Sequence, residues 1–192
     1  MTHDGLLHFG GIQIHVIAAV LLVLVAVAAG FDLKSRRIPN WLVLMGLITS
    51  LALQIIFSGI GGFKAWGLGL LVGFGVFLPL YLLRAMGAGD VKLMAMVGAF
   101  LGPVSALGAV LTTLVVGGAL AIAVALRCGI LKNTLKNIRF ALTLALYKGL
   151  SGGGMQLEQP STSAGNLPYA VAIAVGTLGH LLLVGSGRAV FA

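Results

Sequence analysis

Four of the 192 residues are acidic, and two of these, Asp32 and Asp90, lie at the ends of long apolar segments. Asp4 lies in the polar N-terminal segment and Glu158 in a stretch rich in glycine and serine, so we expect both to be solvated. An ionisable group at a membrane boundary is costly and marks a functional site by default. Two carboxyls held close together can divide general acid and general base work, because one stays protonated while the other ionises.

The sequence around Asp90 is a first sign of a site. Asp90 closes the motif Gly87-Ala88-Gly89-Asp90. Glycine before a carboxylate lets the backbone approach closely and adopt a positive φ. We therefore expect Gly87 and Gly89 to shape the backbone beside this carboxyl.

The sequence after Asp32 is a second sign. Asp32 is followed by Arg36, Arg37, Ile38, Pro39, Asn40 and Trp41. Pro39 extends the residue before it and suits the first turn of a helix, and Asn40 can cap that helix. An ordinary helix start explains these residues equally well, so their role in a site stays open.

The elements that position the two aspartates are membrane helices. Hydrophobic residues make up 59% of the chain and charged residues 8%, which excludes a water-soluble domain. A spanning helix needs about 20 mostly apolar residues. We predict an all-α, polytopic membrane protein with one domain over 1–192 and six spans, at 14–31, 41–58, 65–83, 89–106, 108–126 and 168–184. We also predict an amphipathic helix on the membrane surface at 131–142 and a flexible loop at 151–166.

The basic residues indicate an orientation for these spans. The net charge is +8, and ten of the twelve lysines and arginines fall into three groups that six crossings place on one side. The positive-inside rule makes that side the cytoplasm, with both termini outside. Asp32 follows the first span and Asp90 the third, so both carboxyls reach this same face.

Other kinds of site receive no support from the sequence. The single Cys128 and the four histidines lack the spacing of metal ligands, so we expect no metal and no cofactor. The basic residues lie between apolar runs rather than in a recognition element, so we expect no nucleic-acid partner. No nucleophile with an adjacent histidine is apparent.

The two motifs together resemble the signature of the prepilin peptidases, which are membrane aspartic proteases of the GxGD type. The matching residues are Asp32 with Arg37-Ile38-Pro39-Asn40, then Gly87-Ala88-Gly89-Asp90-Val91-Lys92, and more weakly Leu167-Pro168-Tyr169-Ala170. The resemblance implies that Asp32 and Asp90 are catalytic. It implies a short form of the Flp pilus type that cleaves a prepilin leader, without the methyltransferase domain of larger relatives. It also implies a place in the bacterial inner membrane, with the site facing the cytoplasm beside the pilus assembly machinery.

Several supporting roles remain open at this stage. Gly87, Gly89, Pro39, Asn40, Pro168 and Tyr169 are candidates to support the site, and Lys92 and Arg37 to orient the carboxylates or contact substrate. Helix dipoles suggest Asp90 as the base and Asp32 as the acid, although Arg36 and Arg37 oppose this. The alternatives are simple salt bridges of Asp32 with Arg36 and of Asp90 with Lys92 or Arg84, a proton-coupled transporter or channel that uses both aspartates as a relay, and a noncatalytic scaffold.

Overall fold

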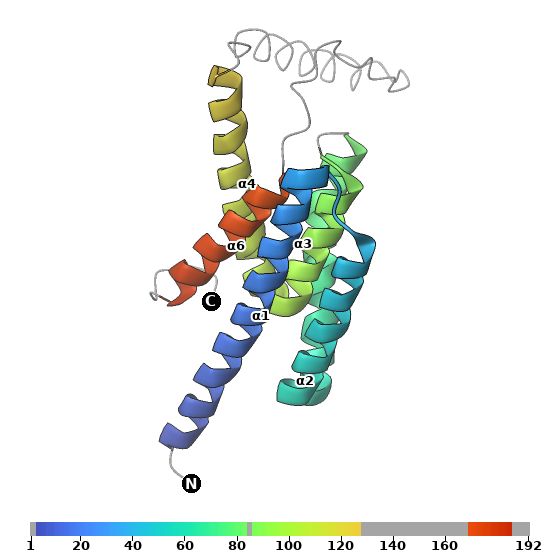
Figure 1. Ribbon diagram of the computed structural model, residues 1–192. Coiled ribbons are helices and arrows are strands. Elements are labelled where there is room, and N and C mark those ends of the chain that lie inside the picture. The colour runs from blue at the N-terminus through green and yellow to red at the C-terminus, as the bar shows by residue number, and fades with distance from the viewer. Residues whose placement is uncertain (1–2, 84–85, 128–168, 186–192) are drawn as a thin grey trace, which may run out of the picture. The chain divides into compact units, whose positions relative to one another are not determined.

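The computed structural model describes residues 3–83, 86–127 and 169–185, and all its regular structure there is helical (Figure 1). The prediction of an all-α protein is confirmed. The helices are α1 (His3–Ser35), α2 (Asn40–Leu82), α3 (Ala88–Leu101), α4 (Pro103–Arg127) and α6 (Tyr169–Gly185). The amphipathic helix predicted at 131–142 and the loop predicted at 151–166 lie outside the described residues.

The chain divides into two compact units, residues 1–117 with 168–192, and residues 118–167. Only the last turns of α4 are described in the second unit. The packing discussed below lies in the first unit. That the chain forms one domain stays a prediction.

Three of the described helices are long and apolar enough to cross a membrane. These spans are Val16–Ser35, Asn40–Leu82 and Pro103–Val124, and Tyr169–Gly185 is a shorter apolar helix. The predicted membrane character is thereby confirmed, whereas the number of six crossings and their orientation stay predictions.

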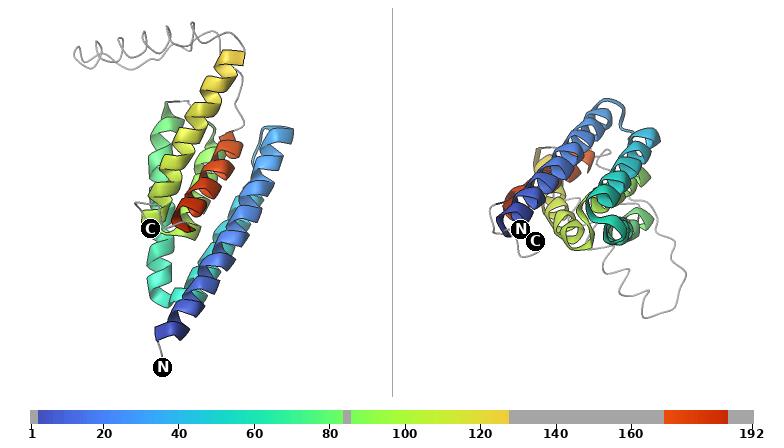
Figure 2. Two further views of the ribbon diagram at one scale, coloured as in Figure 1. Left: turned by 90° about the vertical axis from the view of Figure 1, so that its left-hand side faces the viewer. Right: turned by 90° about the horizontal axis from the view of Figure 1, so that it is seen from below.

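α2 is a pair of helical segments joined by a sharp turn. Its 43 residues would extend about 65 Å as one straight helix, twice the thickness of a membrane core. Gly59 breaks it with φ 56° and ψ −135°, a conformation open to glycine. The second half runs back beside the first (Figure 2), and the indole N–H of Trp66 donates to Ser50 Oγ at 2.9 Å across the pair. The two halves correspond to the spans predicted at 41–58 and 65–83.

α3 is a short helix whose residues from Leu93 to Phe100 are all buried. Glycines of α2 let its backbone come close: a side chain at Gly69 would meet the carbonyl of Gly98, and one at Gly73 the carbonyl of Met94. With 14 residues the helix is about 21 Å long, shorter than a membrane core.

The chain turns from α3 into α4 at Gly102. Its φ of 77° lies in the left-handed region, and Pro103 begins the next helix, a position that suits proline. Gln54 of α2 donates to the carbonyl of Phe100 at 3.0 Å and so satisfies part of the end of α3. The span predicted at 89–106 therefore ends at Leu101, and that predicted at 108–126 begins at Pro103.

α6 packs against α1, α3 and α4. Thr112 of α4 donates to the carbonyl of Gly176 at 2.9 Å, and Gly108 leaves room for the ring of His180. This packing brings the first residues of α6 to the last turn of α1, where the site lies.

Candidate active site

Asp32 lies in the last turn of α1 and is 7% exposed. Its Oδ2 accepts a hydrogen bond from the backbone N–H of Ala170 at 3.2 Å. Ala170 is the second residue of α6, where unpaired N–H groups and the helix dipole favour a negative charge. The carboxylate of Asp32 therefore occupies the N-terminus of α6.

Asp90 is the third residue of α3 and is 9% exposed. Its Oδ2 accepts the backbone N–H of Gly87 at 3.1 Å. Such a bond holds a carboxyl at the start of its own helix. The side chain is thus fixed by the motif to which it belongs.

The two glycines of the motif supply space rather than an unusual backbone. Gly87 has φ −79° and ψ 155°, which any residue can adopt, and Gly89 is helical, so the expected positive φ is wrong. The close approach is present: a Cβ on Gly89 would lie 3.4 Å from side-chain carbons of Ile38. Ile38, from the segment after α1, therefore packs directly on the motif.

The ionisation of Asp90 is affected by its burial and by the charge of Asp32. Asp90 lies outside the three candidate membrane spans, and its pKa is raised from 3.8 to about 6. Burial is the main cause; the hydrogen bond from Gly87 lowers the pKa, and the charge of Asp32 raises it. The charge of Asp32 is thus one of three influences on the carboxyl of Asp90.

The segment between α1 and α2 completes one side of the site. The backbone N–H of Arg36 donates to the carbonyl of Asp32 at 2.9 Å, and the positive φ of Arg36, 53°, ends α1 one turn after the aspartate. The carbonyl of Pro39 accepts the N–H of Leu42 at 3.2 Å. The side-chain carbonyl of Asn40 accepts a hydrogen bond from the ammonium of Lys92 at 3.0 Å, and this bond links α2 to α3.

Tyr169, the first residue of α6, lies on the other side. Its ring meets that of Phe77 edge to face, with the ring centroids 6.2 Å apart. A Cβ on Gly117 would lie 2.6 Å from the hydroxyl oxygen of Tyr169, so Gly117 provides its space.

Gly87, Gly89 and Tyr169 thus lie beside the pair, whereas Asn40 and Lys92 contact each other on another side of α3. Arg37 is exposed, and its backbone carbonyl accepts the Ser35 hydroxyl at 3.2 Å. Pro168 lies outside the described residues. Among the residues that the structure describes, no group of three histidine, cysteine or acidic side chains is placed to hold a metal.

Two contacts of the site were missed by sequence reasoning. Ile38 lies inside the quoted Arg-Ile-Pro-Asn motif, and its apolar side chain in a polar segment is the signal that could have indicated packing. The backbone N–H of Ala170 has no signal of its own, since every residue except proline carries such a donor.

Fold and site together define a helical membrane protein with two interacting buried carboxyls supplied by different helices. The chain belongs to the type IV leader peptidase family, whose family model matches residues 19–122. This match confirms the resemblance to prepilin peptidases and implies a protease that acts on prepilins. Neither a curated protein nor a solved structure matches the chain. The family match includes both aspartates, whereas Tyr169 lies outside it.

Proposed function

We propose that this protein is an aspartic endopeptidase that removes the short basic leader of a Flp-type prepilin, with Asp32 and Asp90 as the catalytic pair. The observation that carries the proposal is the electrostatic interaction of two buried carboxyls from α1 and α3. Family membership supports the reaction class. The coupled pair supports the aspartic subtype, because peptide hydrolysis by two carboxyls needs one ionised and one protonated.

The surroundings favour Asp32 as the base and Asp90 as the acid. Both carboxyls accept one backbone N–H at a helix N-terminus, so this contact does not distinguish them. Burial raises the pKa of Asp90 to about 6, which stabilises its protonated form. These roles are the reverse of those suggested by the sequence, which weighed the C-terminus of α1 at Asp32 and the helix N-terminus at Asp90 but could not include the burial of Asp90.

The reaction then has two proton transfers in its first step. Asp32 takes a proton from water as the water oxygen bonds to the scissile carbonyl carbon, and Asp90 gives its proton to the carbonyl oxygen. In the second step the C–N bond breaks, the amide nitrogen receives the proton held by Asp32, and Asp90 recovers a proton from the gem-diol as the new acid forms. The pair ends in its starting protonation state.

The proposed place of cleavage is the cytoplasmic face of the inner membrane, beside the pilus assembly machinery. Lys34, Arg36 and Arg37 follow Asp32 directly, and Lys92 follows Asp90 by two residues. The positive-inside rule favours the cytoplasm for this end. A substrate helix that leaves the membrane here presents its leader junction to the pair.

Cleavage of a prepilin by the purified full-length protein in lipid tests the proposal. Asp32→Asn and Asp90→Asn should each lower the rate by at least about a hundredfold, because each removes one proton-transfer partner. Asp4→Asn, the same change at an acidic residue outside the pair, should cleave at the wild-type rate. Normal cleavage by either Asp32→Asn or Asp90→Asn would remove the dyad and leave the family assignment standing.

A further inference from the structure

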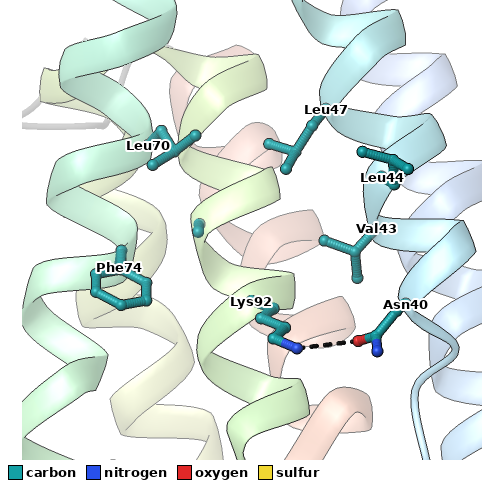
Figure 3. A pocket seen from close by; sticks show the side chains of 8 residues that line it. Asn40, Val43, Leu44, Leu47, Leu70, Phe74 and Lys92 are labelled. Atoms are coloured by element: carbon teal, nitrogen blue, oxygen red, sulfur yellow. Dashed lines mark hydrogen bonds between the residues drawn. The ribbon is translucent and has the colours of Figure 1, made fainter.

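An apolar groove lies between the two halves of α2, with α3 behind it (Figure 3). Val43, Leu44 and Leu47 line it from the first half, and Leu70 and Phe74 from the second. Its volume of about 410 Å³ is within the range of small-molecule sites. Leu44 is 59% exposed, so the groove opens toward the surroundings of the bundle.

One end of this groove is polar and positively charged. Lys92 donates to the Asn40 side-chain carbonyl at 3.0 Å, and both side chains are exposed. An ammonium has three donors, so two remain, and the bond leaves the Asn40 amide group as a donor as well. This end therefore presents donors and a positive charge to a ligand, which suits an anion.

The groove is separate from the carboxyl pair. Successive residues of a helix are turned by about 100°, so Lys92 projects from α3 on nearly the opposite side from Asp90. The side chain of Asp90 is buried, whereas that of Lys92 is exposed at the groove. A molecule in the groove can stay bound while the pair acts on another.

We propose that this groove binds one anionic phospholipid of the membrane, with an acyl chain along the leucines and the phosphate on Lys92 and Asn40. Asn40 is the first residue of a candidate membrane span, which is the depth at which lipid headgroups lie. Anionic headgroups attract basic side chains at this depth. The apolar groove matches an acyl chain and the positive end matches a phosphate; an anionic lipid is favoured over a zwitterionic one because no headgroup cation offsets its phosphate.

Native mass spectrometry of the full-length protein, titrated in detergent with dioleoyl-phosphatidylglycerol or dioleoyl-phosphatidylcholine, tests the charge. Lys92→Gln should bind phosphatidylglycerol about fivefold more weakly, the contribution of one lysine beside an anionic lipid. Lys64→Gln removes the same charge at the turn of α2, away from the groove, and should bind as the wild type does. Equal weakening by both variants would overturn the proposal.

A second pair of variants tests the groove itself. Leu70→Trp should fill the groove and weaken binding of phosphatidylglycerol, whereas Leu71→Trp, on the neighbouring exposed residue, should not. Circular dichroism establishes that each variant is folded, and Lys92→Gln, at an exposed residue, decides the case if Leu70→Trp is not. Displacement of bound phosphatidylglycerol by a synthetic prepilin peptide would instead assign the groove to substrate. Because no measurement uses cleavage, the result is independent of the proposed peptidase activity.

Discussion

Asp32 and Asp90 each accept one backbone N–H at the beginning of a helix, but the donors differ in their distance along the chain. Gly87 is three residues from Asp90, within the same motif. Ala170 is 138 residues from Asp32. The first bond follows from local geometry at a helix start, whereas the second requires the tertiary fold. The two carboxyls therefore respond to different parts of the protein.

The raised pKa of Asp90 predicts how stability depends on pH. The folded protein holds this proton up to about pH 6, and the unfolded chain releases it near 3.8, so the contribution of Asp90 is fully present below pH 3.8 and is lost as the pH rises through about 6. The rise corresponds to about 3 kcal/mol. Asp90→Asn cannot ionise, so we expect it to melt several degrees above the wild type at pH 7.5 in a thermal scan.

The same scan at pH 4 provides the comparison. Asp90 is protonated there in the folded wild type, so the difference in melting temperature between wild type and Asp90→Asn should nearly vanish. Asp4→Asn controls for the loss of one charge. An equal difference at both pH values would contradict the raised pKa.

At the scale of elements, the turn within α2 determines where the second half can pack. Gly59 has a backbone conformation that side chains other than glycine rarely adopt. Past this turn, Trp66 returns to Ser50 and Gly69 reaches α3. One residue thus sets the position of the helix pair against which α3 is held.

Gly59→Ala should destabilise the protein because alanine is strained at φ 56°. The cost of about 1–3 kcal/mol predicts a melting temperature lower by several degrees. Gly61→Ala is the matched control: Gly61 is helical and a Cβ there meets nothing within 4 Å, so alanine should be neutral or stabilising. Equal melting of the two variants would show that the turn does not depend on Gly59.

Helix bounds were predictable where the chain carries strong breakers and less so elsewhere. Gly102 and Pro103 separate α3 from α4, whereas the spans predicted at 89–106 and 108–126 meet at residue 107. The apolar sequence runs on through this turn, so hydropathy alone has no signal there. The close packing of α3 on the glycines of α2 and the hydrogen bond from Gln54 define the end of α3. These are tertiary contacts, which the local sequence does not reveal.

At the scale of the whole molecule, the basic residues predict a topology that labelling can test. Lys34 lies in the last turn of α1 beside the site, and Lys64 lies in α2 shortly after the turn at Gly59, near the far end of the first half. In a Cys128→Ser background, Lys34→Cys should react with a membrane-impermeant maleimide only from the cytoplasmic side, and Lys64→Cys only from outside. Labelling of both from one side would contradict the predicted crossings.

That Asp32 and Asp90 lie at the same membrane face was predictable by counting the spans, because the first and third spans end on the same face. The helices that surround the pair were less so. Lys92 and Asn40 were both singled out, but not their contact, and the packing of Ile38 on Gly89 was not foreseen. Side-chain partners between helices depend on rotation about each helix axis, which one sequence does not specify.

The bond from Ala170 to Asp32 has a consequence for the order in which the protein becomes competent. A ribosome delivers the first helix to the membrane long before the last, and the donor for Asp32 emerges 138 residues after its acceptor. Until the final helix has inserted, the carboxylate lacks this partner, whatever the state of the other helices. A nascent or truncated chain that ends before α6 therefore carries both aspartates but not the completed site.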